Sequence, residues 1–127
     1  MTMPVKRVLI VDDHAAVRRT VTRMLNDVPH FEVCGEAENG RVGIEKALQL
    51  KPDVIVLDLS MPVMNGLEAA RVLRTLMPGT PILMYTAFTN ANLAKEALAA
   101  GVSRVASKTS PPGALLDDLQ ALVNDAI

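Results

Sequence analysis

Three aspartates in this sequence stand where metal and phosphate chemistry would need them. Asp12 and Asp13 directly follow the apolar run Val8–Val11, and Asp58 directly follows the apolar run Val54–Leu57. Carboxylates brought together repel one another and shift each other's pKa unless a cation neutralises them. Mg²⁺ suits such a group because it prefers octahedral oxygen coordination and keeps positions open for phosphate oxygens. A carboxylate beside the ion can attack phosphorus, so Asp58 is the candidate nucleophile.

The elements that would position these acids alternate strictly along the chain. Five apolar runs rich in Val, Ile and Leu predict strands over 5–11, 31–35, 54–59, 81–86 and 102–106. Stretches with helical spacing predict helices over 14–27, 39–50, 66–77, 90–100 and 111–125. Strict strand–helix alternation favours a parallel sheet with helices on both faces. The predicted fold class is a doubly wound α/β domain.

In an open α/β sheet, ligands bind beyond the carboxyl ends of the strands. The three aspartates are expected there, together with Thr86 at the end of the fourth strand and Lys108 after the fifth. Lys108 can pair with a phosphoryl oxygen as a point charge, and the Thr86 hydroxyl can donate a hydrogen bond to another. Three acids, one hydroxyl and one ammonium therefore converge on one edge.

Five segments spread over the chain carry a family resemblance. They are Val8–His14, Asp58–Pro62, Asn65-Gly66, Thr86-Ala87 and Lys108. Together they resemble a CheY-like response-regulator receiver over essentially the whole chain. The paired acids followed by His14, and the Asp58–Gly66 stretch, resemble most the receivers of the NarL/FixJ type.

The resemblance implies a five-stranded flavodoxin-like sheet with strand order 2-1-3-4-5. It also implies that Asp58 is the phospho-acceptor, and that Mg²⁺ is held by Asp12, Asp13, Asp58 and the backbone carbonyl of Ser60. Thr86 and Lys108 would then sense the phosphate. The resemblance also marks three loop residues that would tune the site: Ser60, Met61 and Phe88.

Two positions depart from the usual receiver pattern. Similar receivers carry a rotating aromatic residue three positions before the lysine, where this chain has Val105. Many also have a proline after the lysine in a cis bond, where this chain has Thr109. A cis bond without proline costs roughly 2.5–4 kcal/mol, which leaves the isomer of the Lys108–Thr109 bond open.

Structural roles compete with the functional ones at three positions. Asp13 is expected to cap the first helix in addition to binding metal. His14 falls in the first helical turn, where we expect exposure and not ligation. Asp53 begins its strand at the opposite edge of the sheet, and we predict a purely structural role for it.

Composition excludes several classes of function. The 13 Lys and Arg against 14 Asp and Glu give a net charge of -1, which offers no basic face for nucleic acid. No run of about 18 apolar residues occurs, and the single Cys34 has no disulfide partner, so a cytoplasmic protein without membrane contact is expected. Residues 1–127 are predicted to form one receiver domain, with DNA bound only through an effector domain absent from this chain.

The leading hypothesis is a phosphorelay module of a two-component system, phosphorylated by a sensor histidine kinase or a phosphotransfer protein. It would catalyse only its own phosphorylation and dephosphorylation, dimerise on phosphorylation, and take part in regulation such as that of transcription. A Mg²⁺-dependent phosphohydrolase of the haloacid-dehalogenase type is one rival, but Asp12-Asp13-His14 lacks its Asp-x-Asp spacing. An FMN carrier is another, although two acids would repel its phosphate. A pseudo-receiver that binds partners without phosphorylation is the third.

Overall fold

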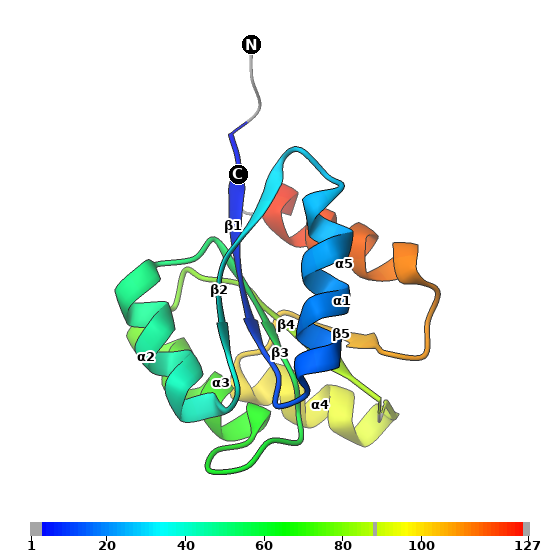
Figure 1. The fold of residues 1–127 in the computed structure, drawn as a ribbon. Helices are drawn as coiled ribbons and strands as arrows, with labels where there is room; N and C mark the ends of the chain where they lie inside the picture. The colour runs from blue at the N-terminus through cyan, green and yellow to red at the C-terminus, as the bar shows by residue number, and fades with distance from the viewer. Residues whose placement is uncertain (1–3, 88, 126–127) are drawn as a thin grey trace.

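The computed structural model describes residues 4–87 and 89–125, which form five strands and five helices in strict alternation (Figure 1). The strands are β1 Lys6–Val11, β2 Phe31–Ala37, β3 Val54–Leu57, β4 Ile82–Thr86 and β5 Arg104–Ser107. The helices are α1 Ala15–Asn26, α2 Gly40–Leu50, α3 Gly66–Leu76, α4 Ala91–Ala100 and α5 Pro112–Asp125. The predicted element order is confirmed.

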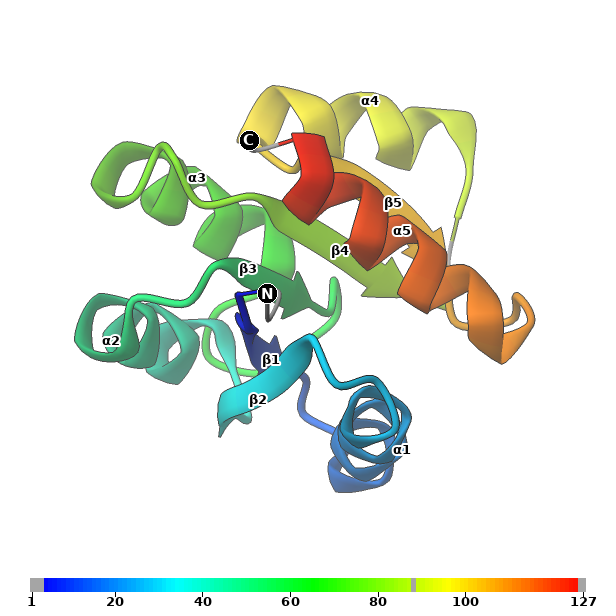
Figure 2. The same cartoon turned by 90° about the horizontal axis from the view of Figure 1, so that it is seen from above.

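All neighbouring strands pair in parallel, in the order β2-β1-β3-β4-β5. Seen along the sheet, α1 and α5 cover one face, and α2, α3 and α4 cover the other (Figure 2). Because β1 and β3 lie inside the sheet and are covered on both faces, they are apolar on both sides. All four residues of β3 are buried, as are the last four of β1. The predicted fold class is confirmed.

Two apolar clusters, one on each face of the sheet, hold the helices in place. Leu9, Ile55 and Leu57 belong to the cluster that includes residues of α2, α3 and α4. Ile10 and Val56 belong to the other, which includes residues of α1 and α5. Alternate residues of one strand thus enter opposite layers, as the strand period requires. The sheet is therefore a rigid frame for side chains at its ends.

The strand boundaries differ from the predicted ones where local hydrogen bonds decide them. β2 continues to Ala37, because Val11 still pairs with Ala37 after a register irregularity between Val8 and Leu9. The last strand begins at Arg104 and not at residue 102, because the Val102 N–H bonds to the Ala97 carbonyl of the preceding helix end. Gly101, at φ 105°, makes that helix end possible.

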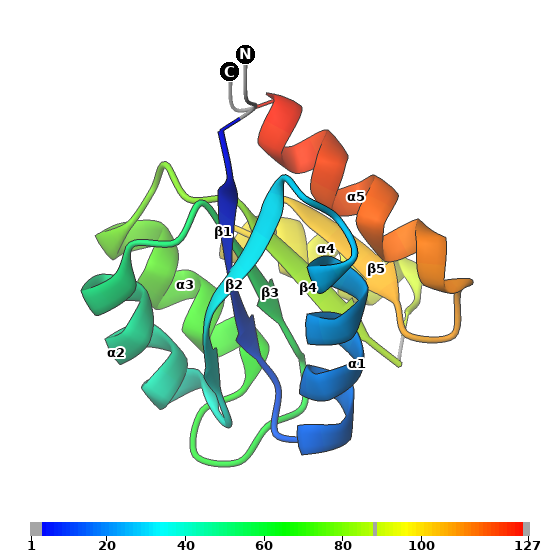
Figure 3. The ribbon, with the colours of Figure 1, turned by 45° about the horizontal axis from the view of Figure 1, so that its top comes forward.

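The parallel strands bring their carboxyl ends to one edge of the sheet, where the connections into α1 and α3 leave β1 and β3 (Figure 3). The helices α2, α3 and α4 each follow an asparagine whose side chain accepts a backbone N–H: Asn39, Asn65 and Asn90. These caps set where each loop ends. Among residues 4–87 and 89–125, no helix has the length and apolar character that a membrane crossing requires.

Candidate functional site

The acids of β1 and β3 lie side by side because these two strands are neighbours in register. Val11 pairs with Leu57, so the residues that follow, Asp12 and Asp58, leave adjacent strand ends. Backbone bonds hold both in place: the Asp58 N–H donates to the Val11 carbonyl at 2.9 Å. Only 2% of Asp12 and 4% of Asp58 is exposed. Two carboxylates are therefore buried together, as the sequence predicted.

Lys108 reaches across the edge of the sheet to both of these acids. Its Nζ lies 2.7 Å from Asp12 Oδ2 and 3.3 Å from Asp58 Oδ1. Burial by itself would lower the pKa of Lys108, but the hydrogen bond and charge of Asp12, followed by those of Asp58, outweigh it and raise the pKa. Lys108 is therefore a fully charged cation inside the site.

The charged form of the Asp58 carboxyl remains disfavoured even with Lys108 beside it. Burial raises its pKa, and the charge of Asp12 raises it further, while Lys108 and the Leu59 N–H act in the opposite direction. Leu59 N donates to Asp58 Oδ1 at 2.8 Å. One ammonium thus does not neutralise the cluster, which favours an additional cation.

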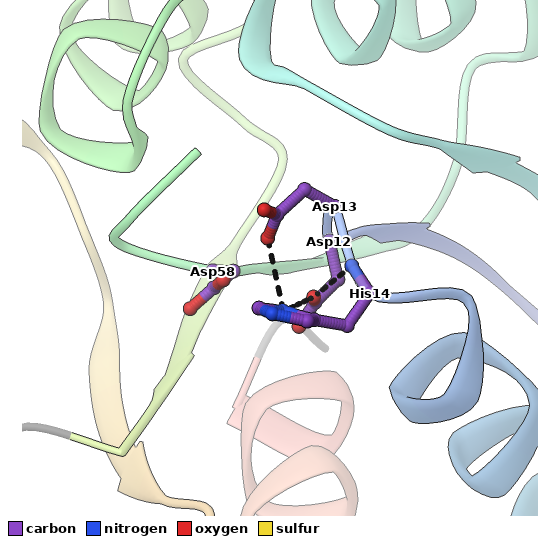
Figure 4. A group of neighbouring side chains, drawn as sticks. All are labelled: Asp12, Asp13, His14 and Asp58. Atoms are coloured by element: carbon purple, nitrogen blue, oxygen red, sulfur yellow. Dashed lines mark hydrogen bonds and ion pairs between the residues drawn. The ribbon is translucent and has the colours of Figure 1, made fainter. Parts of the chain in front are cut away.

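Asp13 and His14 complete the cluster from the loop that leads into α1 (Figure 4). Asp13 Oδ1 is buried and accepts no hydrogen bond, although His14 Nδ1 is 3.1 Å away. The capping role predicted for Asp13 is wrong: the cap position is His14, whose side chain makes no capping hydrogen bond. Asp12 Oδ1 instead accepts the His14 backbone N–H at 2.9 Å. Asp13 therefore points into the site and not at the helix.

The donor set fits a metal ion. Asp12, Asp13, His14 and Asp58 each offer a ligand atom, and these atoms lie within 4.8 Å of one another. A cation would give the buried Asp13 oxygen the partner that it lacks, and would offset the charge that raises the Asp58 pKa. The cluster could therefore hold a metal, and oxygen donors favour a hard ion such as Mg²⁺.

The other predicted site residues take up varied positions. Thr86 is the buried last residue of β4, and its carbonyl accepts the Lys108 N–H at 2.9 Å. Ser60 is exposed and Met61 half-buried in the loop after β3. Val105 is half-buried and packs against the cluster on the α2–α4 face. Phe88 lies outside the described residues.

Sequence reasoning missed Arg18 as a residue that supports the site, and it missed the close approach of Gly66 to Asp58. Arg18 of α1 donates from Nη1 to the Asp12 carbonyl at 2.6 Å and from Nε to Glu36 Oε1 at 3.1 Å. A Cβ at Gly66 would lie 2.2 Å from the Asp58 carbonyl oxygen, so only glycine allows α3 to start there. Glycine after Asn65 was visible as a helix start, but its close approach to Asp58 depends on the tertiary fold.

The remaining structural expectations are settled by the geometry. Asp53 accepts the Arg7 N–H at 2.8 Å at the amino edge of the sheet, so its predicted structural role is confirmed. His14 is exposed, with 66% of its side chain accessible. The Lys108–Thr109 bond is trans, as are all peptide bonds of the described residues.

Comparison with known proteins identifies the class of this fold and site. The family profile described as the response regulator receiver domain matches residues 8–120. The response regulator domain of Thermotoga maritima CheB superposes with a TM-score of 0.88, at 32% identity over 94% of this chain and 97% of that one. The receiver domain of the putative regulator NarL from Mycobacterium tuberculosis gives a TM-score of 0.91, at 28% identity over 96% and 98%.

Curated relatives include longer proteins. A protein-glutamate methylesterase/protein-glutamine glutaminase of Archaeoglobus fulgidus is 44% identical over 111 residues, which is 87% of this chain and 31% of the relative. Its counterpart from a Nocardioides species is 38% identical over 115 residues, or 89% and 31%. The chain thus spans about a third of the length of these relatives.

The chain belongs to the response regulator receiver domain family. It is a CheY-like phospho-accepting receiver of a two-component system, which controls an effector. Membership implies interaction with a histidine kinase or a phosphotransfer partner, and receivers of this family bind Mg²⁺ at an acidic pocket.

Proposed function

We propose that Asp58 accepts the phosphoryl group, and that Asp12, Asp13, Asp58 and the backbone carbonyl of Ser60 hold Mg²⁺. The observation that carries this assignment is the Lys108 ammonium, placed between Asp12 and Asp58 inside a buried acid cluster. When bound, Mg²⁺ would offset negative charge on the phosphoryl oxygens. The acid cluster contains one cation, Lys108, which does not balance all of its carboxylates, so the cluster is suited to bind a divalent ion as well.

The residues of this chain define the course of the transfer. Leu59 N–H and Lys108 Nζ both contact Asp58 Oδ1, so we assign Oδ2 as the attacking oxygen. A new bond forms between that oxygen and phosphorus, and the bond from phosphorus to the donor breaks. The group that carried the phosphoryl, a histidine imidazole or a small carboxylate, leaves with the electron pair of that bond. No general base is needed, because a carboxylate nucleophile has no proton to give up.

Lys108 and Thr86 are proposed to sense the product. Once Asp58 is phosphorylated, Lys108 gains a phosphoryl oxygen as a partner in place of the carboxylate, and the Thr86 hydroxyl donates to another. Because Lys108 N–H bonds to the Thr86 carbonyl, the ends of β4 and β5 would respond together. The changed surface would control an effector, in the same protein or in another, with dimerisation and action on DNA as possible outputs.

Intact-mass measurement after incubation with acetyl phosphate and Mg²⁺ tests the assignment. We expect one added phosphoryl group in the wild type and none in Asp58→Asn or after EDTA treatment. Asp53→Asn is the matched control, because it changes the acid at the other end of the same strand, and it should label normally. Normal labelling of Asp58→Asn would reject the acceptor assignment.

The labelling experiment and a phosphomonoester turnover assay together separate the rival functions. A pseudo-receiver would add no phosphoryl group under any condition. A phosphohydrolase would release phosphate from an added phosphomonoester with repeated turnover, whereas a receiver should leave that substrate intact. We therefore propose no enzymatic activity for these residues beyond phosphorylation and dephosphorylation of Asp58.

A further inference from the structure

The imidazole of His14 lies against the acid cluster, although its ring is mostly exposed. Nδ1 is 3.3 Å from Asp12 Oδ1 and 3.1 Å from Asp13 Oδ1 (Figure 4). Neither the proposed phosphoryl transfer nor its sensing uses this ring. His14 is held there by its own backbone, since its N–H donates to Asp12 Oδ1 at 2.9 Å.

The contact between His14 and Asp12 is a hydrogen bond in the metal-free protein, and both separations are also close to those between neighbouring ligands of one metal ion. Zinc bonds to nitrogen and oxygen are about 2.0–2.2 Å long, which places adjacent donors of a tetrahedron roughly 3.3–3.5 Å apart. The His14 nitrogen meets that spacing with both Asp12 and Asp13, within a few tenths of an ångström. Asp58 supplies the fourth donor, and all four donor atoms already lie within 4.8 Å of one another.

We propose that His14 gives this site a second metal-binding mode, in which Asp12, Asp13, His14 and Asp58 together take a borderline transition ion such as Zn²⁺ or Co²⁺. The inference rests on the proposed Mg²⁺ site, since three of its ligands are shared. Mg²⁺ prefers oxygen and gains little from an imidazole, whereas Zn²⁺ and Co²⁺ favour it. His14 therefore discriminates between ions without being required for Mg²⁺.

The second mode has a functional consequence. Four protein donors complete a tetrahedral shell, whereas a Mg²⁺ site keeps open positions for phosphoryl oxygens. In addition, Asp58 would be occupied as a ligand through the carboxylate that has to attack phosphorus. Zn²⁺ held through His14 would therefore compete with Mg²⁺ and block phosphorylation.

Calorimetric titration of the tag-free full chain with Zn²⁺ and with Mg²⁺ tests the proposal. His14→Ala should weaken Zn²⁺ binding at least about tenfold, because even residues that only hydrogen-bond to metal ligands contribute that much to affinity. The Mg²⁺ affinity should stay within about twofold of wild type. His30→Ala is the matched control. The chain has two histidines, and His30 bonds to Gln120 at the amino edge of the sheet, so its loss should leave both affinities unchanged.

The imidazole ¹⁵N resonances give a readout independent of affinity. One saturating equivalent of Zn²⁺ should shift a His14 ring nitrogen and leave those of His30 in place. Equal loss of Zn²⁺ and Mg²⁺ binding in His14→Ala, or an unshifted His14 ring with Zn²⁺ bound, would overturn the proposal. Failure of the proposed function appears separately, as absent Mg²⁺-dependent labelling of the wild-type chain.

Discussion

Two aspartates flank the four-residue strand β3, and their surroundings are opposite. Asp53, before the strand, is exposed, accepts the Arg7 N–H, and donates its own N–H to the Arg7 carbonyl. Asp58, after the strand, is buried beside Asp12, and this raises its pKa. The charge of Asp53 is satisfied by the Arg7 N–H and by exposure to solvent, whereas the charge of Asp58 is buried next to another acid.

The two aspartates therefore serve different purposes: Asp53 stabilises the amino edge of the sheet, and Asp58 belongs to the proposed site at the carboxyl edge. A charge that is satisfied locally stabilises an edge and leaves nothing for a ligand to improve. A buried charge that the fold only partly satisfies is stabilised further by a bound cation or by covalent modification, so ligand binding changes its energy strongly. The amino edge of the sheet is therefore expected to tolerate substitutions that disable the carboxyl edge.

The largest expected effect is that of Lys108→Ala on the response to phosphorylation. Lys108 pairs with the phosphoryl product and is not the nucleophile. Some labelling of Asp58 should therefore remain in Lys108→Ala, while most phosphate-driven chemical-shift changes are lost. Lys46→Ala is the control, since Lys46 lies near the same edge but donates to the Glu36 carbonyl. A full set of wild-type shift changes in Lys108→Ala would refute the sensing role.

Two glycines test the steric difference between the edges. A Cβ at Gly66 would lie 2.2 Å from the Asp58 carbonyl oxygen, whereas one at Gly79, near Asp53, meets nothing within 4 Å. Gly66→Ala should lower the free energy of unfolding by about 1–3 kcal/mol and impair labelling. Gly79→Ala should change neither by a measurable amount. Equal denaturant midpoints for the two variants would contradict the close packing assigned to Gly66.

Asp12 and Asp13 should behave oppositely in stability, though both bind the metal. Asp13→Ala removes a buried oxygen without a hydrogen bond and relieves repulsion, so metal-free stability should rise by up to about 1 kcal/mol. Asp12→Ala deprives Lys108 and the His14 N–H of their partner and should lose about 1–3 kcal/mol. Both variants should bind Mg²⁺ at least tenfold more weakly by titration. Mg²⁺ affinities equal to wild type would show the acid pocket to be misassigned.

The sequence was sufficient for the fold and for where the acids would converge. Apolar runs such as the one before Asp58 are long enough to identify a buried parallel strand, and parallel strands place their following residues at one edge. The convergence of Asp12, Asp58 and Lys108 follows from that rule alone. Their roles as acceptor, ligand and sensor were taken from the family resemblance.

Other features depend on interactions that no local pattern reveals. Asp13 has the residue type and position of a helix cap, yet its oxygen turns to the site and the cap position falls on His14. Arg18 reads as one more polar residue on a helix, and only the tertiary fold shows that it bonds to the Asp12 carbonyl. Sequence patterns describe the neighbours along the chain, whereas these contacts join separate elements.

A smaller effect compares the two acids that flank β3 directly in the metal-free protein. The pKa of Asp58 is raised by folding, so its carboxyl favours the folded state below its unfolded pKa, and that contribution is lost as pH rises through the folded pKa. Asp58→Asn should therefore raise the melting temperature at neutral pH, with a gain that fades on acidification. Asp53→Ala should lower stability by about 0.5–1.5 kcal/mol through its lost hydrogen bond. A neutral-pH loss in Asp58→Asn would contradict the unfavourable burial.

The smallest expected change concerns the side chain at Val105, where similar receivers have a rotating ring. Valine is β-branched and stiff about its one side-chain torsion, so it should keep its rotamer when the site is phosphorylated. We expect Thr86 instead to move toward the phosphate with the loop 86–90, which includes Phe88. Structures of the free and beryllofluoride-bound forms would test this, and a fixed loop with a rotated Val105 would rule it out.

Tyr85 offers a second view of the same event at the carboxyl edge. It is the only tyrosine of a chain without tryptophan, and Lys108 Nζ lies 5.9 Å from its ring centre. When Lys108 turns to the phosphoryl group, the charge over the ring shifts, so beryllofluoride with Mg²⁺ should alter tyrosine emission. The change should persist in Val105→Ala and vanish in Lys108→Ala. Emission that changes equally in Lys108→Ala would show that the lysine does not carry the signal to this ring. The response would then have to reach Tyr85 through the backbone of β4, whose last residue, Thr86, adjoins it.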